Sequence, residues 1–148
     1  MDADEQLARE AIRKTLGACT QAGDARKAAA YAACFTEDGV LELDVRHAGR
    51  DGIFRFMTAP SPIPQPGAEQ QSPGFVSHHL TTCRIELTTP VSAKVKTYWL
   101  VITAAGLDHS GYYDDVFRRD GEAWLIEYRR PRTLWVSETS LLVARPGA

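Results

Sequence analysis

Two adjacent histidines in the stretch FVSHHLTTCRIEL (residues 75–87) are the first candidates for chemistry. An unperturbed imidazole has a pKa of about 6.5, so a positioned histidine can give or take a proton near neutral pH. The stretch reads as a strand, and neighbouring side chains on a strand point to opposite faces. We therefore expect only one of His78 and His79 to face a pocket.

A second stretch, SGYYDDVF (residues 110–117), brings hydroxyl and carboxyl groups together on another strand. Alternation places Ser110, Tyr112 and Asp114 on one face of that strand. Asp115 belongs to the opposite face, where we expect it to form a structural ion pair with Arg129 or Arg130 of the next strand.

Composition excludes several classes of function. The net charge of −2 gives no basic field for nucleic acid, and no apolar run approaches the roughly 20 residues of a membrane-spanning helix. The start of the chain is acidic and amphipathic rather than a secretory signal. Three cysteines without metal-ligand spacing indicate reduced thiols in a cytoplasmic protein. We expect no metal and no cofactor, because neither converging ligands nor a glycine-rich phosphate loop is present.

The elements that must position these residues follow from periodicity and turn signals. Helices are expected at 5–18, 25–35 and 53–57, with a stop at Gly23 and Asp24 as the N-cap of the second helix. Thr36–Gly39 should be a turn before a strand at 40–45. A proline-rich loop at 59–74 should form a mobile rim over a cavity. Longer strands are expected at 76–87, 91–104, 109–119 and 123–135.

This order predicts an α+β fold, with three N-terminal helices packed on a strongly curved antiparallel sheet that forms a cone-shaped barrel. Such an arrangement leaves an apolar cavity between the sheet and the helices. The whole chain, 1–148, is expected to be one domain with its core at about 5–136. Residues 137–148 should form a loose or partner-facing tail.

Three stretches resemble the SnoaL-like branch of the nuclear transport factor 2-like superfamily. They are GDARKAAAYAACFTEDGVLEL, SHHLTTCRIEL and HSGYYDDVFRRDGEAWLIEYRRPRTLW, and they span roughly residues 5–136. The branch contains dehydratases, isomerases, epoxide hydrolases and polyketide cyclases, together with members that only bind or scaffold. The resemblance therefore implies the fold more firmly than any one activity.

The resemblance implies that His78 is the catalytic histidine and that His79 is structural. The acid that pairs with this histidine in scytalone dehydratase and its relatives falls on Gln21 here, while Asp24 falls on a later capping aspartate. A glutamine can orient an imidazole or a water molecule by hydrogen bonding, but it cannot stabilise an imidazolium by charge.

The resemblance also implies a set of substrate contacts. Tyr112 is expected to polarise a substrate oxygen and Ser110 to position it, and Asp114 would reach the same cavity. Arg132 would act as an anion clamp near the mouth, since a guanidinium binds oxyanions at two points. Trp99 is expected in the cavity wall.

The expected function is that of a cofactor-independent enzyme that acts on a small, apolar, cyclic or polyketide-like molecule. Acid/base proton transfer would lead to dehydration, isomerisation or cyclisation. One alternative is epoxide-hydrolase-like activation of water. Another is a non-catalytic ligand-binding or assembly module with a degenerate site. We expect a homodimer in either case.

Overall fold

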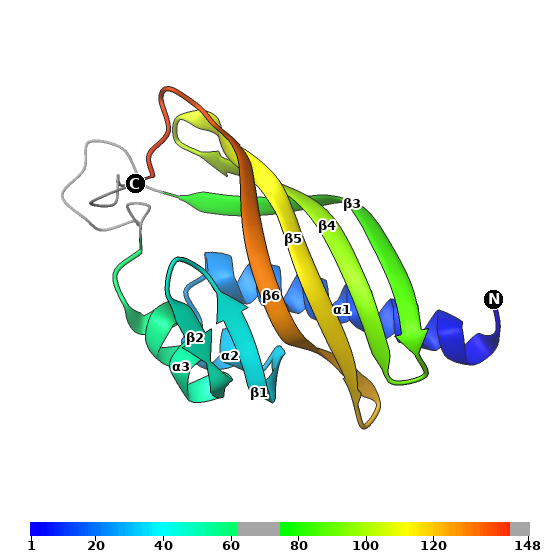
Figure 1. Cartoon of the computed structure of the whole chain (residues 1–148). Helices are drawn as coiled ribbons and strands as arrows, with labels where there is room; N and C mark the ends of the chain where they lie inside the picture. The colour runs from blue at the N-terminus through cyan, green and yellow to red at the C-terminus, as the bar shows by residue number, and fades with distance from the viewer. Residues whose placement is uncertain (62–74, 143–148) are drawn as a thin grey trace.

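In the computed structural model, which describes residues 1–61 and 75–142, helix α1 (Ala3–Asp24) crosses one face of a twisted sheet (Figure 1). Asp2 caps its start by accepting a hydrogen bond of 2.8 Å from the backbone N–H of Glu5. The buried residues of α1 recur every three or four positions and face the sheet. They are Ala8, Ile12, Thr15, Leu16, Cys19 and Ala22.

Helix α1 is longer than the sequence predicted. It runs through Gly23 to Asp24, so the predicted stop is wrong, and Lys27 rather than Asp24 precedes α2 (Ala28–Ala32). The helix ends where Arg26 adopts a φ of 56° and the N–H of Lys27 bonds the carbonyl of Ala22 at 2.9 Å. Glycine usually occupies this left-handed position, so an arginine there gave no stop signal.

Six strands form one sheet in the order β2-β1-β6-β5-β4-β3. All neighbours pair antiparallel except β1 and β6, which pair parallel, so the sheet is mixed rather than purely antiparallel. Helix α3 (Gly49–Thr58) lies beside β1 and β2 (Figure 1). The strand bounds are Phe35–Glu42 for β1, Arg46–Ala48 for β2, Val76–Thr89 for β3, Ser92–Thr103 for β4, Gly106–Asp120 for β5 and Ala123–Val136 for β6.

The predicted α+β architecture and its four long C-terminal strands are confirmed. The predicted turn at Thr36–Gly39 is wrong, because those residues form a bulge inside β1, where the pairing with β6 slips between Phe35 and Val40. The short strand β2 was not predicted. Most of the predicted rim, from residue 62 to 74, lies outside the described residues. In the described residues no helix is both long and apolar enough to cross a bilayer.

The sheet has an inner face toward α1 and an outer face toward solvent. Phe117 of β5 and Ile126 of β6 are fully buried in one apolar cluster with Ile12 and Leu16 of α1. On β4 the buried residues alternate with exposed ones, as expected for a sheet covered on one side. The inner face at the β3–β5 end carries Trp99, Val101 and Tyr113 in a second, smaller cluster.

Gly111 is required where β5 passes beneath the Trp99 ring. A Cβ atom added at this glycine would lie 2.7 Å from Cζ2 of Trp99 and 1.9 Å from the carbonyl oxygen of Arg132. Neither distance is compatible with van der Waals packing, and the second contact is with backbone that cannot swing aside. The absence of a side chain therefore lets the indole lie close to the strand.

We predict that Gly111→Ala lowers the free energy of unfolding by about 1–3 kcal/mol or more, because it overpacks this contact. Gly17→Ala is the matched control, since no atom lies within 4 Å of a Cβ added at that exposed position of α1. The control should be neutral or stabilising by up to about 1 kcal/mol, the helix-propensity difference. Urea unfolding of both variants provides the measurement, and equal stability of the two would contradict the account.

Candidate active site

Asp24, the last residue of α1, holds His78 at the start of β3 by two contacts. One carboxylate oxygen lies 2.6 Å from Nδ1 of the imidazole, and the other accepts a hydrogen bond of 2.9 Å from the backbone N–H of His78. The His78 and Asp24 side chains are 30% and 20% exposed, so both are reachable but partly desolvated. An ionised carboxylate only accepts hydrogen bonds, so Nδ1 is the donor opposite such a carboxylate, and in a neutral ring with that tautomer Nε2 has the lone pair.

This contact corrects the assignment of the acid. The resemblance placed Gln21 at the acid position and predicted that it would orient either His78 or a water molecule. Asp24 contacts the His78 ring instead, while Gln21 is exposed about one helical turn earlier. His78 faces α1, whereas His79 is exposed and lies 3.0 Å from the Ser77 hydroxyl. Both histidines line the cleft described next, so the expectation that only one of them faces a pocket is not met, and what distinguishes His78 is its contact with Asp24.

A cleft of about 410 Å³ between α1 and β3 opens onto His78. This volume is in the range of small-molecule sites. Its other lining residues include Arg13, Leu16, Gly17, Thr20, Gln21, Leu80 and Thr97. A larger groove of about 1360 Å³ runs along the N-terminal half of α1, but neither His78 nor Asp24 lines it. We place the chemistry at the smaller cleft because it contains the paired histidine.

Three aromatic rings flank this region on the inner face. The Trp99 ring centre lies 6.2 Å from that of His78, 5.6 Å from that of His109 and 5.9 Å from that of Tyr113. Trp99 thus lies beside His78 but does not line the cleft between α1 and β3, so its place in a cavity wall stays a prediction, and Tyr113 and His109 were missed as its neighbours. Burial raises the pKa of Tyr113, so its phenol stays protonated at neutral pH.

Behind Tyr113, the ion pair of Asp115 and Arg129 is buried. Two N–H···O bonds of 2.9 and 2.8 Å join the guanidinium to the carboxylate, which confirms the predicted structural role of Asp115 and selects Arg129 as its partner. The guanidinium carbon also lies 3.8 Å from the Tyr113 ring centre. Fork geometry and cation–π stacking together make the pair suitable for a buried site.

Four residues expected in or near the cavity lie elsewhere. Ser110, Tyr112 and Asp114 belong to the outer face, because the inner face of β5 carries the buried residues at 111, 113, 115 and 117. Tyr112 instead packs against Tyr98 and Lys96.

Arg132 is exposed within β6, directly opposite Tyr112, so it too lies on the outer face. The predicted pocket-lining positions of all four residues are therefore wrong. Alternation defines two sets of residues on a strand, but it does not say which set is buried.

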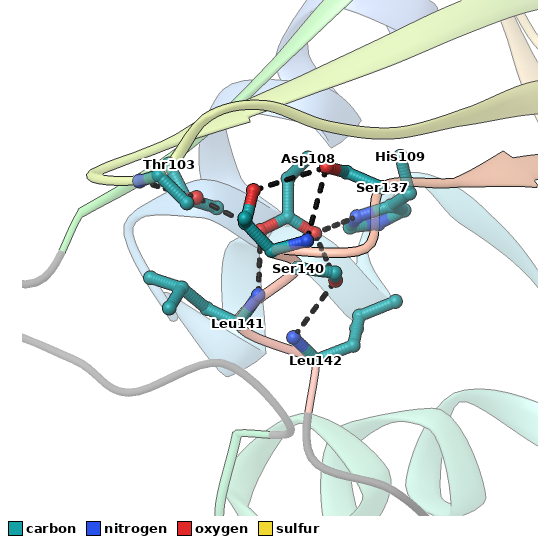
Figure 2. Close-up of polar contacts among 9 residues, drawn as sticks. Thr103, Asp108, His109, Ser137, Ser140, Leu141 and Leu142 are labelled. Carbon is teal, nitrogen blue, oxygen red and sulfur yellow. Dashed lines mark hydrogen bonds and ion pairs between the residues drawn. The ribbon is translucent and has the colours of Figure 1, made fainter.

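Asp108 forms a fully buried junction that holds the C-terminal segment against the sheet (Figure 2). Its carboxylate accepts hydrogen bonds from the backbone N–H of Leu141 at 2.8 Å, from the Thr103 hydroxyl at 2.9 Å and from the Ser140 hydroxyl. It also lies 2.7 Å from Nδ1 of His109. Residues 137–142 are thus fixed rather than loose, and the expected free tail can begin only at residue 143, outside the described residues.

The described residues contain no group of three or more His, Cys, Asp or Glu side chains arranged to hold a metal ion. The chemistry that they offer is that of the acid/base pair. A histidine with its Nδ1 fixed by a carboxylate presents Nε2 as a base, and the carboxylate stabilises the imidazolium that forms on proton transfer.

We predict that Asp108→Asn releases the C-terminal segment. The amide keeps one acceptor oxygen but no charge, and its NH₂ group can only donate, so the Leu141 N–H is left with a neutral acceptor at best. The Leu141 amide should exchange its hydrogen about tenfold faster, because hydrogen bonds to a charged acceptor are stronger than those to a neutral one. Glu138→Gln, an exposed change in the same segment, is the control. Unchanged protection of Leu141 would contradict this role.

The same junction predicts a pH dependence. Burial alone would raise the pKa of Asp108, but the hydrogen bonds from Leu141, Ser140, His109 and Thr103 outweigh it and lower the pKa to about 2. Because the folded-state pKa lies below the ordinary value, the stabilisation is complete above about pH 4 and is lost as the pH falls toward 2. Protection of Leu141 should follow that profile, and loss beginning near neutral pH would contradict it.

Comparison with known proteins identifies the fold. No curated protein matches the chain, but several solved structures do. One is named "Putative Scytalone Dehydratase" and comes from Novosphingobium aromaticivorans. It has a TM-score of 0.77 and 18% identity, with 99% of this chain and 97% of that chain covered.

Two further structures are similar. Hexachlorocyclohexane dehydrochlorinase LinA-type3 from Novosphingobium barchaimii has a TM-score of 0.76 and 15% identity, with 99% of this chain and 100% of that chain covered. Rv3472 from Mycobacterium tuberculosis, a protein of unknown function, has a TM-score of 0.72 and 26% identity, with 90% and 76% covered. The sequence also matches the SnoaL-like domain over residues 4–130, and the chain therefore belongs to the SnoaL-like domain family.

Proposed function

We propose that the chain is a cofactor-independent lyase in which His78 removes a proton from a carbon next to an electron-withdrawing group. The substrate class is a small, largely apolar ring, and elimination follows when a group leaves the neighbouring carbon. The observation that carries this proposal is the 2.6 Å contact between Asp24 and Nδ1 of His78. It supplies the charged partner that a histidine base needs.

The two members of the pair have different roles in this proposal. Nδ1 donates to Asp24, so Nε2 accepts the substrate proton, and the imidazolium that forms lies against a carboxylate. A positioned acid/base group of this kind contributes about 10²- to 10⁴-fold to a rate. The second bond from Asp24, to the His78 backbone, fixes the carboxylate so that it cannot rotate away from the ring.

The surroundings support an apolar ring as the bound molecule. Leu16 and Leu80 line the cleft, and the indole of Trp99 lies beside the imidazole. Two solved structures with this fold carry the names of a dehydratase and a dehydrochlorinase, and both names denote eliminations. At their identities the likeness shows the fold alone, so the proposal rests on the pair of Asp24 and His78.

The residues around His78 support one of the two alternative functions, water activation, more than the other, a non-catalytic binding module. Water activation for hydrolysis remains a second candidate, because Gln21 lines the same cleft as His78 and could orient a water molecule. The non-catalytic binding module was favoured only by a missing acid. A carboxylate within hydrogen-bond reach of His78 removes that reason.

The test of this proposal is hydrogen exchange at a carbon acid. 1-Indanone, a small cyclic ketone with exchangeable protons beside its carbonyl, is incubated with the protein in D₂O and followed by NMR. We predict that His78→Ala lowers the catalysed exchange by about 10²- to 10⁴-fold. Asp24→Asn should lower it by about 10- to 10³-fold, since the charge that favours the imidazolium is lost.

His79→Ala is the matched control, because His79 is the exposed neighbour on the same strand. It should retain nearly full activity. Equal losses from the two histidine variants, or no catalysed exchange by the wild-type protein, would refute the assignment of His78 as a base.

A further inference from the structure

The indole nitrogen of Trp99 is a buried donor without a partner. Among residues 1–61 and 75–142 it is the only buried side-chain nitrogen or oxygen that makes no hydrogen bond, and Trp99 as a whole is 5% exposed. Leaving such a donor unsatisfied costs about 1–3 kcal/mol. Most buried polar groups in native proteins are satisfied, so this cost requires an explanation.

No acceptor beside the indole meets its N–H. An indole N–H can only donate, so it needs an acceptor. The two imidazoles that flank the ring each use Nδ1 elsewhere, His78 with Asp24 and His109 with Asp108. Neither imidazole accepts a hydrogen bond from the Trp99 N–H through its other nitrogen.

The backbone of β5 also leaves room for the indole. Gly111 removes the Cβ atom that would lie 2.7 Å from Cζ2, the ring atom one bond from the carbon that carries Nε1. The indole can consequently lie close to the backbone of β5, and Trp99 is 5% exposed, so packing restricts its movement. Its N–H direction is fixed before any ligand binds, which is the condition for a hydrogen bond that orients a ligand at low entropic cost.

The remaining surroundings of Trp99 are apolar. Val76, Leu80, Leu141 and Leu142 pack against the cluster that contains it. Leu141 and Leu142 belong to the C-terminal segment that Asp108 holds in place (Figure 2), so this segment covers part of the cluster. A ligand that fits here has an apolar body and one acceptor atom that meets the N–H.

We propose that Trp99 is a positioning residue whose indole N–H binds the carbonyl oxygen of a small cyclic ketone and turns its acidic C–H toward His78. This inference rests on the proposed function for the identity of the base. In the step, the proton moves from the carbon to Nε2 of His78, and the C–H electron pair forms a C=C bond. The carbonyl π electrons move onto the oxygen, which becomes an enolate. The bond from Trp99 strengthens as that charge develops.

The test is an NMR titration of ¹⁵N-labelled protein that follows its three indole N–H resonances, with Trp99→Phe and Trp135→Phe used for assignment. The probe is 1-indanone, and indane, which has the same rings without the oxygen, is the control ligand. We expect indanone to shift the Trp99 resonance downfield and indane not to. Trp99→Phe, which keeps an aromatic ring but no donor, should bind indanone about 2- to 10-fold more weakly, the value of one hydrogen bond.

The outcomes separate this inference from the proposed function. A downfield Trp99 shift without catalysed proton exchange supports the hydrogen bond and refutes the base. Catalysed exchange with no indanone-specific Trp99 shift refutes the hydrogen bond and leaves the base intact. Failure of indanone to bind, or equal affinity of the wild-type protein and Trp99→Phe for it, also overturns the role of Trp99.

Discussion

The carboxylate of Asp24 joins two segments that are 54 residues apart, and the site depends on that junction. One oxygen binds the backbone of β3 and the other binds the imidazole of His78, so a single side chain fixes both the strand and the rotamer of the base. Hydrogen bonds to a charged acceptor are stronger than neutral ones and are directional. Because Asp24 is the last residue of α1, the length of that helix determines whether the pair can form.

The inner face around this junction combines apolar packing with a few buried polar groups whose hydrogen bonds are satisfied. Arg129 and Asp115 satisfy each other in a two-point contact, and Asp108 accepts four hydrogen bonds. Polar groups with satisfied hydrogen bonds hold their neighbours rigidly, and a preorganised site requires such rigidity. The N–H of Trp99 differs from these groups, because it is buried and makes no hydrogen bond.

Much of the fold could be predicted from the sequence, because alternation and turn residues are local signals. The four long strands follow from period-two patterning and from the Asp120-Gly121 turn, where Gly121 has a φ of 62°. The pairing of Asp115 with Arg129 followed from cross-strand neighbours. The end of α1 could not be predicted in this way, because the residue with the left-handed backbone conformation is Arg26 rather than a glycine. Local patterning also gives no information on the parallel pairing of β1 with β6, because that pairing joins distant segments of the chain.

The errors at the site have one physical origin. Sequence position along a strand defines two faces, but only packing against α1 decides which face is inside. The resemblance placed Ser110 and Tyr112 in the cavity, but they lie on the outer face, while Tyr113 lies on the buried inner face. Likewise, Asp24 carried a capping signal that competed with its contact to His78, 54 residues away. A tertiary contact of this kind leaves no trace in local periodicity.

The most direct test of the central claim is the tautomer of His78 in the free protein. Long-range ¹H–¹⁵N correlation spectra of the imidazole, recorded at a pH where the ring is neutral, distinguish a protonated Nδ1 from a protonated Nε2. The account predicts that Nδ1 carries the hydrogen, because it donates to Asp24, and that Nε2 is free to act as a base. A dominant Nε2–H tautomer would contradict it.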